Sequence, residues 1–166
     1  MSPTPGARFP DEVETTLRAA GWTPGRKDVQ RARHWGLTLS AWASPAGHQH
    51  TFSPKASNAL AEFGGLVVDQ SGPGVDVART PFTLDPELAL PTWLTLRGLG
   101  GAIGSGLFPL GIEDDGVSTL AIDTTGRVFA LDHTAEWMLG RTIDEALTTL
   151  VLGLRPVRVR ADGTLG

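Results

Sequence analysis

The sequence predicts a single α+β domain with a mixed or antiparallel central sheet flanked by helices. Helical patterns lie toward both ends of the chain, strand patterns lie between them, and residues 108–132 contain the clearest hairpin signal. Strands and helices do not alternate along the chain, as they would in a parallel α/β fold. Together these observations favour one core built on the central sheet.

The hairpin has a first strand over residues 119–123, in which apolar and polar positions alternate as in a half-buried strand. At the turn, Asp123 can brace a type I turn, and Gly126 can take the left-handed conformation that closes a bulged hairpin. The partner strand is apolar throughout residues 128–131. We therefore expect the second strand to lie centrally and to be covered on both faces.

Three helices are predicted before the hairpin. The first begins after Pro10 and ends at Gly21, with one narrow apolar stripe. Residues 29–41 fit a second helix, with a strand as the alternative because glycine and threonine weaken the helical pattern. Ser53 precedes a third helix over residues 54–63, in which apolar residues recur at helical spacing.

Short strands are predicted at residues 66–68, 75–78 and 82–84, separated by turn residues. Residues 88–103 have apolar positions at near-helical spacing, but four glycines make the end of this segment loose. The strands between the third helix and the hairpin are therefore expected to extend the central sheet.

A closing helix begins at a capping box, in which Thr142 is the N-cap and Glu145 follows three residues later. Its apolar side chains form one unbroken stripe, so we expect it to be a main support of the sheet. The stripe comprises Ile143, Ala146, Leu147, Leu150, Val151 and Leu154. For the chain as a whole, we predict a flexible N-terminus over residues 1–8, one domain over 9–154, and a tail or edge strand over 155–166.

Composition excludes several classes of protein. No apolar run approaches the ~20 residues that a membrane span needs, and the first residues lack the apolar core of a signal peptide. The chain has no cysteine, which excludes a disulfide framework, a thiolate nucleophile and a cysteine-based zinc site. A net charge of −4 argues against general nucleic-acid binding. We predict a cytoplasmic protein that binds neither membrane nor nucleic acid.

Motifs for catalysis or metal binding are weak. Residues 98–106 are rich in glycine but lack the spacing of a phosphate-binding loop, and Ser105 is not part of a nucleophile elbow. His48 and His50 could touch one metal, yet no third ligand lies nearby. Residues 113–116 lack the alternating acids of a calcium loop. The sequence therefore predicts no enzyme, no cofactor and no metal.

Charge is unevenly distributed along the chain. Residues 111–145 carry eight acidic and two basic residues, a pattern that can steer a charged partner or form an ordinary solvated surface. A basic segment at residues 26–33 could grip nucleic acid, but Asp28 and the acidic total argue against this. The candidate partner-binding residues are Glu113, Asp114, Asp115, Asp132 and Glu136.

From about residue 9 to residue 154, a set of short motifs resembles the SUKH superfamily. The resemblance is strongest to its subgroup of bacterial immunity proteins. The order and spacing of the motifs, more than any one of them, make the resemblance specific. The motifs are Phe9-Pro10, Ala19-Ala20-Gly21-Trp22, the LAEFGGL run at residues 60–66, Pro81-Phe82 with Asp85-Pro86, Phe108-Pro109-Leu110-Gly111, Ala121-Ile122-Asp123 with Gly126-Arg127-Val128, and Leu139-Gly140.

The resemblance implies an α+β domain without a catalytic centre. It also implies an immunity protein that neutralises a cognate secreted polymorphic toxin, a nuclease or a nucleic-acid deaminase, by direct binding. Two positions depart from the family pattern: Ile112 stands where relatives often carry Glu, and Phe129 where they often carry Tyr. The alternative is a regulatory scaffold domain that binds a host protein without any toxin partner. The sequence leaves the oligomeric state open.

Overall fold

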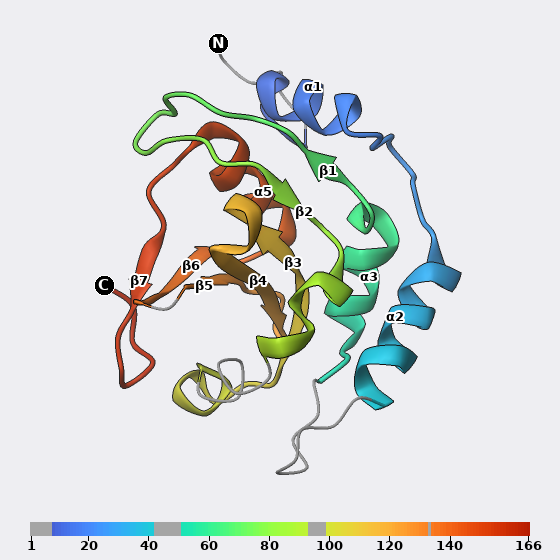
Figure 1. Ribbon diagram of the computed structural model, residues 1–166, viewed down its shortest axis with the longest axis vertical. Helices are drawn as coiled ribbons and strands as arrows, with labels where there is room; N and C mark the ends of the chain where they lie inside the picture. The colour runs from blue at the N-terminus through green and yellow to red at the C-terminus, as the bar shows by residue number, and fades with distance from the viewer. Residues whose placement is uncertain (1–7, 42–50, 93–98, 133) are drawn as a thin grey trace.

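The computed structural model describes residues 8–41, 51–92, 99–132 and 134–166, and within them the chain forms a seven-stranded sheet (Figure 1). The strands lie side by side in sequence order, and every pair is antiparallel. The α+β prediction is confirmed, and the sheet is antiparallel rather than mixed. The strands are β1 (Val67–Val68), β2 (Phe82–Thr83), β3 (Leu107–Glu113), β4 (Ser118–Asp123), β5 (Val128–Leu131), β6 (Glu136–Gly140) and β7 (Val157–Val159).

The helices agree closely with the sequence prediction. They are α1 (Asp11–Ala19), α2 (Val29–Ala41), α3 (Pro54–Phe63) and α5 (Ile143–Leu152), with 3-10 turns η1 (Pro86–Thr92) and η2 (Asp114–Gly116). The strand alternative for residues 29–41 is wrong. The predicted caps are present, because Ser53 Oγ accepts from the Ala56 N–H at 3.2 Å and Thr142 Oγ1 accepts from the Glu145 N–H at 3.2 Å.

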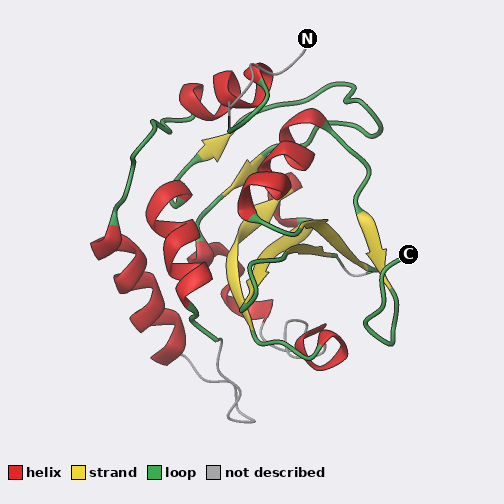
Figure 2. Cartoon of the chain, turned by 180° about the vertical axis from the view of Figure 1, so that it is seen from behind, coloured by secondary structure: helices red, strands yellow, loops and turns green. Residues whose placement is uncertain are grey.

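Helices cover one face of the sheet, as the view from behind shows (Figure 2). On this face, which we call the helical face, α1, α3 and α5 bury side chains against Phe108, Leu120 and Val128 in the larger core cluster. The opposite face carries a smaller cluster that includes Phe129 of β5 and Leu99. The sheet is therefore buried on both sides.

The hairpin forms as predicted, with one correction. β5 is fully buried and central, which confirms the expectation for the second strand. β4 was expected to be half-buried, but all six of its residues are buried, including Ala121 and Thr119 on the smaller cluster's side. The reason is tertiary, since the residues that cover this second face come from distant segments such as Leu99 and Val159.

Two other strand predictions need correction. Residues 75–78 do not join the sheet; the backbone N–H groups of Asp76 and Val77 donate to the Gly153 carbonyl at 2.8 and 2.9 Å, so the segment packs on the end of α5. β1 is shorter than the predicted strand, and Val67 is 59% exposed rather than buried. In the segment predicted from residue 88, the described part forms η1 and a helical turn over residues 99–103.

The two ends of the domain are held by polar contacts. Of the N-terminus predicted to be flexible, residues 1–7 lie outside the described part of the chain. Arg8 donates to Glu62 on α3 and to Asp144 on α5, each at 2.6 Å, and so links the two helices. At the other end, β7 is the edge strand, and the backbone at Val159 bridges to Leu165 as the chain turns back.

Candidate partner-binding groove

A groove of about 950 Å³ opens on the helical face of the sheet, and we call it the sheet-end groove. Its base includes Ala130 and Trp137, its helix side includes Leu150 of α5, and its rim includes Val77 and Val157. Most of this lining is apolar. A cavity of this size is typical of a binding site and exceeds the small voids of a packed core.

The base of the groove includes a position where the sheet carries a small side chain, Ala130. Leu120, Ala130 and Trp137 pair directly across β4, β5 and β6, so their side chains project from the same face. Alanine at the centre of this row has a smaller side chain than its two neighbours, and α5, which ends at Leu152, lines the groove with Thr149 and Leu150. The segment before β7 and the 75–80 loop then form walls around the groove.

Glu113 lies at the end of the groove where β3 stops. Its Oε2 accepts a hydrogen bond of 2.6 Å from the Thr80 hydroxyl, and the ion pairs found among the described residues do not include it. Burial raises the pKa of the Glu113 carboxyl, the Thr80 hydrogen bond opposes this, and the charges of Asp114 and Asp132 add to the rise. Glu113 is thus a partly desolvated carboxylate whose one hydrogen-bond partner in the described part of the chain is Thr80.

Asp132 lies beside it in the groove and closes the turn after β5. Its Oδ1 accepts from the Thr134 N–H at 2.7 Å, the Thr134 hydroxyl at 2.6 Å and the Ala135 N–H at 2.9 Å. Burial alone would raise the pKa of Asp132, but these hydrogen bonds and the indole of Trp137 lower it. Asp132 therefore keeps its negative charge beside Glu113.

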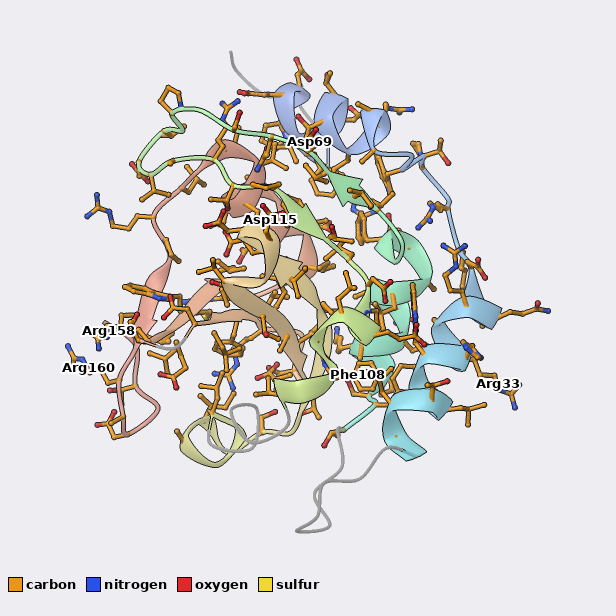
Figure 3. All side chains as sticks on the ribbon, in the orientation of Figure 1. Arg33, Asp69, Phe108, Asp115, Arg158 and Arg160 are labelled. Carbon is orange, nitrogen blue, oxygen red and sulfur yellow. The ribbon has the colours of Figure 1, made fainter. Side chains whose placement is uncertain are left out.

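The other three predicted site residues are placed differently. Asp114 and Asp115 are exposed on η2, and both have a φ of 54°, a left-handed conformation that aspartate tolerates better than most residues. Figure 3 shows Asp115 on this turn above the sheet. Glu136 pairs with Leu131 and Val159 of the smaller cluster, so its side chain projects from the opposite face. The structure groups Glu113 with Asp132 and separates Glu136 from them.

Sequence reasoning did not identify the basic and apolar residues of the groove. Arg155 and Arg158 are exposed and line the side next to β7, where Figure 3 shows Arg158 far from Asp115. Val77 and Val157 are each 40% exposed on the rim. An apolar hollow that carries opposite charges on its two sides is typical of a protein-interaction surface.

The buried position of Glu113 predicts a pH dependence of stability. Because its pKa is raised in the folded state, the folded protein binds this proton more strongly than the unfolded chain, and the stability contribution of Glu113 falls as pH rises through that range. Glu113→Gln removes the charge and keeps an oxygen that can accept from Thr80. We expect the free energy of unfolding of this variant, minus that of the parent protein, to be larger at pH 7.5 than at pH 4. Urea unfolding at the two pH values measures this.

The matched control for this experiment is Asp69→Asn, which removes an exposed carboxylate after β1. It changes the net charge by the same amount without touching the groove. A difference between Glu113→Gln and the parent protein that is the same at both pH values would contradict the desolvation of Glu113.

Other candidate sites from the sequence gain no support. His48 and His50 lie outside the described residues. Ser105 Oγ lies 2.7 Å from Thr124 Oγ1 in a contact between loops. Within the described ranges no cluster of three potential metal ligands occurs, and no helix there has the length and apolar character to cross a membrane.

Comparison with known proteins identifies the family. A model of the SUKH-3 immunity protein family matches residues 9–153. Searches of curated proteins and of solved structures gave no match. The family match spans the whole larger core cluster, all of the smaller cluster except Val159, every strand except β7, and the whole α5 helix. The resemblance seen in the sequence motifs is confirmed, and the chain belongs to the SUKH-3 immunity protein family.

Proposed function

We propose that this protein neutralises a cognate secreted toxin by binding it directly in the cytoplasm of the producing cell, without chemistry of its own. Membership of an immunity protein family supports a toxin as the partner. The observation that supports direct binding is the sheet-end groove, an apolar hollow of about 950 Å³ with charged walls. Its residues are suited to contact rather than to a reaction, because they resemble the core and rim of an interface.

The charge on the groove's acidic side favours a toxin that acts on nucleic acid, a nuclease or a deaminase. Glu113 and Asp132 line the groove, and Asp114 and Asp115 follow on the adjacent turn. An enzyme that binds nucleic acid presents a basic surface to the phosphates. Opposite charges on the two proteins would speed their encounter, and the inhibitor would cover the surface that the substrate needs.

The first experiment is co-expression of the toxin encoded by the neighbouring gene, with and without this protein. We expect cells to survive only when both are present, and the two purified proteins to form a stable complex. Survival without this protein, or a neighbouring gene product that does not bind it, would contradict the proposal. The second outcome would favour the alternative of a regulatory scaffold domain that binds a host protein.

The second experiment tests electrostatic steering. Asp114→Asn and Asp115→Asn remove two exposed charges, and asparagine tolerates the left-handed backbone at both positions. We expect the double variant to associate with the toxin up to ~10-fold more slowly at low salt, with the difference shrinking as salt rises. Asp69→Asn is the control, because Asp69 is exposed but lies on the β1 side of the molecule (Figure 3). Equal association rates would defeat steering while leaving direct binding intact.

A further inference from the structure

The sheet-end groove combines a partly desolvated carboxylate with an apolar surface, and this combination indicates what binds there. We infer that the groove receives an arginine or lysine side chain from an apolar loop of the toxin, and that the cationic group pairs with Glu113 and Asp132. Apolar neighbours in the same loop would cover Trp137 and Val157. The inference rests on the proposed function, since it specifies what the toxin inserts.

The state of Glu113 in the isolated protein supports a cationic ligand. An ionised carboxylate has two oxygens that can each accept more than one hydrogen bond, and the Thr80 hydroxyl supplies a single donor at 2.6 Å. Removing such a group from water is unfavourable unless it is paired. A guanidinium or ammonium group entering the groove would supply both charge and donors. Asp132 next to it has its Oδ1 occupied by the turn but remains negatively charged.

The arginines on the other side of the groove are compatible with a cationic ligand at Glu113. Arg155 and Arg158 are exposed, and exposed charges contribute little to affinity because water and salt screen them. Charges that are partly removed from water, as Glu113 is, have the larger effect when they are paired. Arg155 and Arg158 can instead orient the incoming loop through an acidic residue at its other end, while Glu113 holds the anchor.

The dimensions of the groove indicate a loop rather than one isolated side chain. A volume of about 950 Å³ lies at the upper end of the range for sites that enclose a ligand of several groups. Ala130 forms part of the base, and the exposed Val77 and Val157 form part of the rim. An anchor residue would therefore reach the sheet while its neighbours contact the rim.

The test measures affinity for the purified toxin domain from the neighbouring gene by isothermal titration calorimetry. Glu113→Gln keeps the size of the side chain and an oxygen for Thr80, and we expect it to weaken binding about 30-fold or more. Ala78→Trp, at an exposed position of the lining, would obstruct the groove and weaken binding by a similar factor. Thermal unfolding confirms that both variants are folded.

Two control variants make the same chemical changes elsewhere. Asp69→Asn removes an exposed carboxylate, and Val67→Trp places a large ring on the exposed part of β1. We expect both to bind within about 3-fold of the parent protein. In the toxin, one arginine or lysine changed to glutamine should weaken binding, and adding Glu113→Gln to that change should weaken it little further, because the two residues share one interaction.

The outcomes separate the two proposals. If the parent protein binds the toxin and protects cells but Glu113→Gln and Ala78→Trp bind as tightly as the controls, the groove assignment is overturned and the proposed function stands. If the parent protein neither binds nor protects, both are overturned. Weakening by Ala78→Trp alone would also overturn the role of Glu113, since it would show that the groove is occupied without the charge pair.

Discussion

We expect Asp123→Ala to lower the free energy of unfolding by about 3 kcal/mol. Asp123 is fully buried, and its Oδ1 accepts from the Thr125 N–H at 3.0 Å, the Thr125 hydroxyl at 2.8 Å and the Arg127 N–H at 2.8 Å. Its Oδ2 pairs with the Arg127 guanidinium at 2.7 Å. Alanine would leave the donors of the turn without their acceptor and Arg127 without its counter-charge. Urea unfolding followed by circular dichroism measures the change.

A second turn of the same kind provides the control. Asp132 accepts from Thr134 and Ala135 in the same way, but it is partly exposed and has no arginine partner among the described residues. We expect Asp132→Ala to lower the free energy of unfolding by about 1 kcal/mol, because water can accept some of the hydrogen bonds that the carboxylate accepted. Equal losses at both positions would mean that burial and the Arg127 pair do not determine the stability of the hairpin.

The second large effect is expected at Gly111, where Gly111→Ala should lower the free energy of unfolding by about 3 kcal/mol. A Cβ at this position would overlap the Thr83 carbonyl oxygen and would lie 2.9 Å from the Asp85 nitrogen. Both are backbone atoms, so neither can move aside as a flexible side chain could. Thermal and urea unfolding measure the loss of stability. The toxin-binding assay shows whether the weakened contact between β2 and β3 also affects binding.

Gly101→Ala is the matched control, since an added Cβ there would meet no atom within 4 Å. This glycine lies in the helical turn over residues 99–103, where alanine is the better helix former. We expect the variant to be as stable as the parent protein or slightly more stable. If Gly111→Ala were as stable as Gly101→Ala, the close approach of β2 to β3 would not be the reason for glycine at position 111.

Gly111 also matters for the groove, because it lies beside a bulge in β3. The register of pairing with β4 shifts between Pro109 and Gly111. Before the shift, the side chain of Leu107 lies in the smaller cluster; after it, Glu113 pairs with Ser118 and its side chain lies on the helical face. In a strand without this bulge, residues 107 and 113 would face the same side, since alternate residues share a face. The bulge therefore turns Glu113 from the opposite face into the groove.

Local signals made several elements predictable. Ser53 and Thr142 mark the starts of α3 and α5, because an N-cap needs only its own side chain and the next turn of backbone. The role of Asp123 in the hairpin turn was predictable for the same reason, since all its partners lie within four residues. The family motifs could also be recognised in the sequence, and the match of the SUKH-3 family model to residues 9–153 confirms them.

Other features could not be predicted in this way. β6 was missed, and Trp137 with it, because Trp137, Met138 and Leu139 are consecutive apolar residues without the polar alternation that identifies a strand. Met138 faces the smaller cluster and Leu139 the larger one, so both faces of β6 are covered by other parts of the chain. The segment at residues 75–78 has strand-like composition but packs on α5 through the Gly153 carbonyl. In both cases a distant part of the chain decides the structure.

The sequence by itself determined the fold class, the helix caps, the hairpin turn and the family, because each depends on residues close together in the chain or on their order. Only the tertiary structure decided which acidic residues belong together. Glu113 and Asp132 meet in the groove, whereas Glu136 projects from the other face. The physical reason is that a single bulge reverses the side from which all following side chains of a strand project, and pairing across the sheet fixes where that bulge lies.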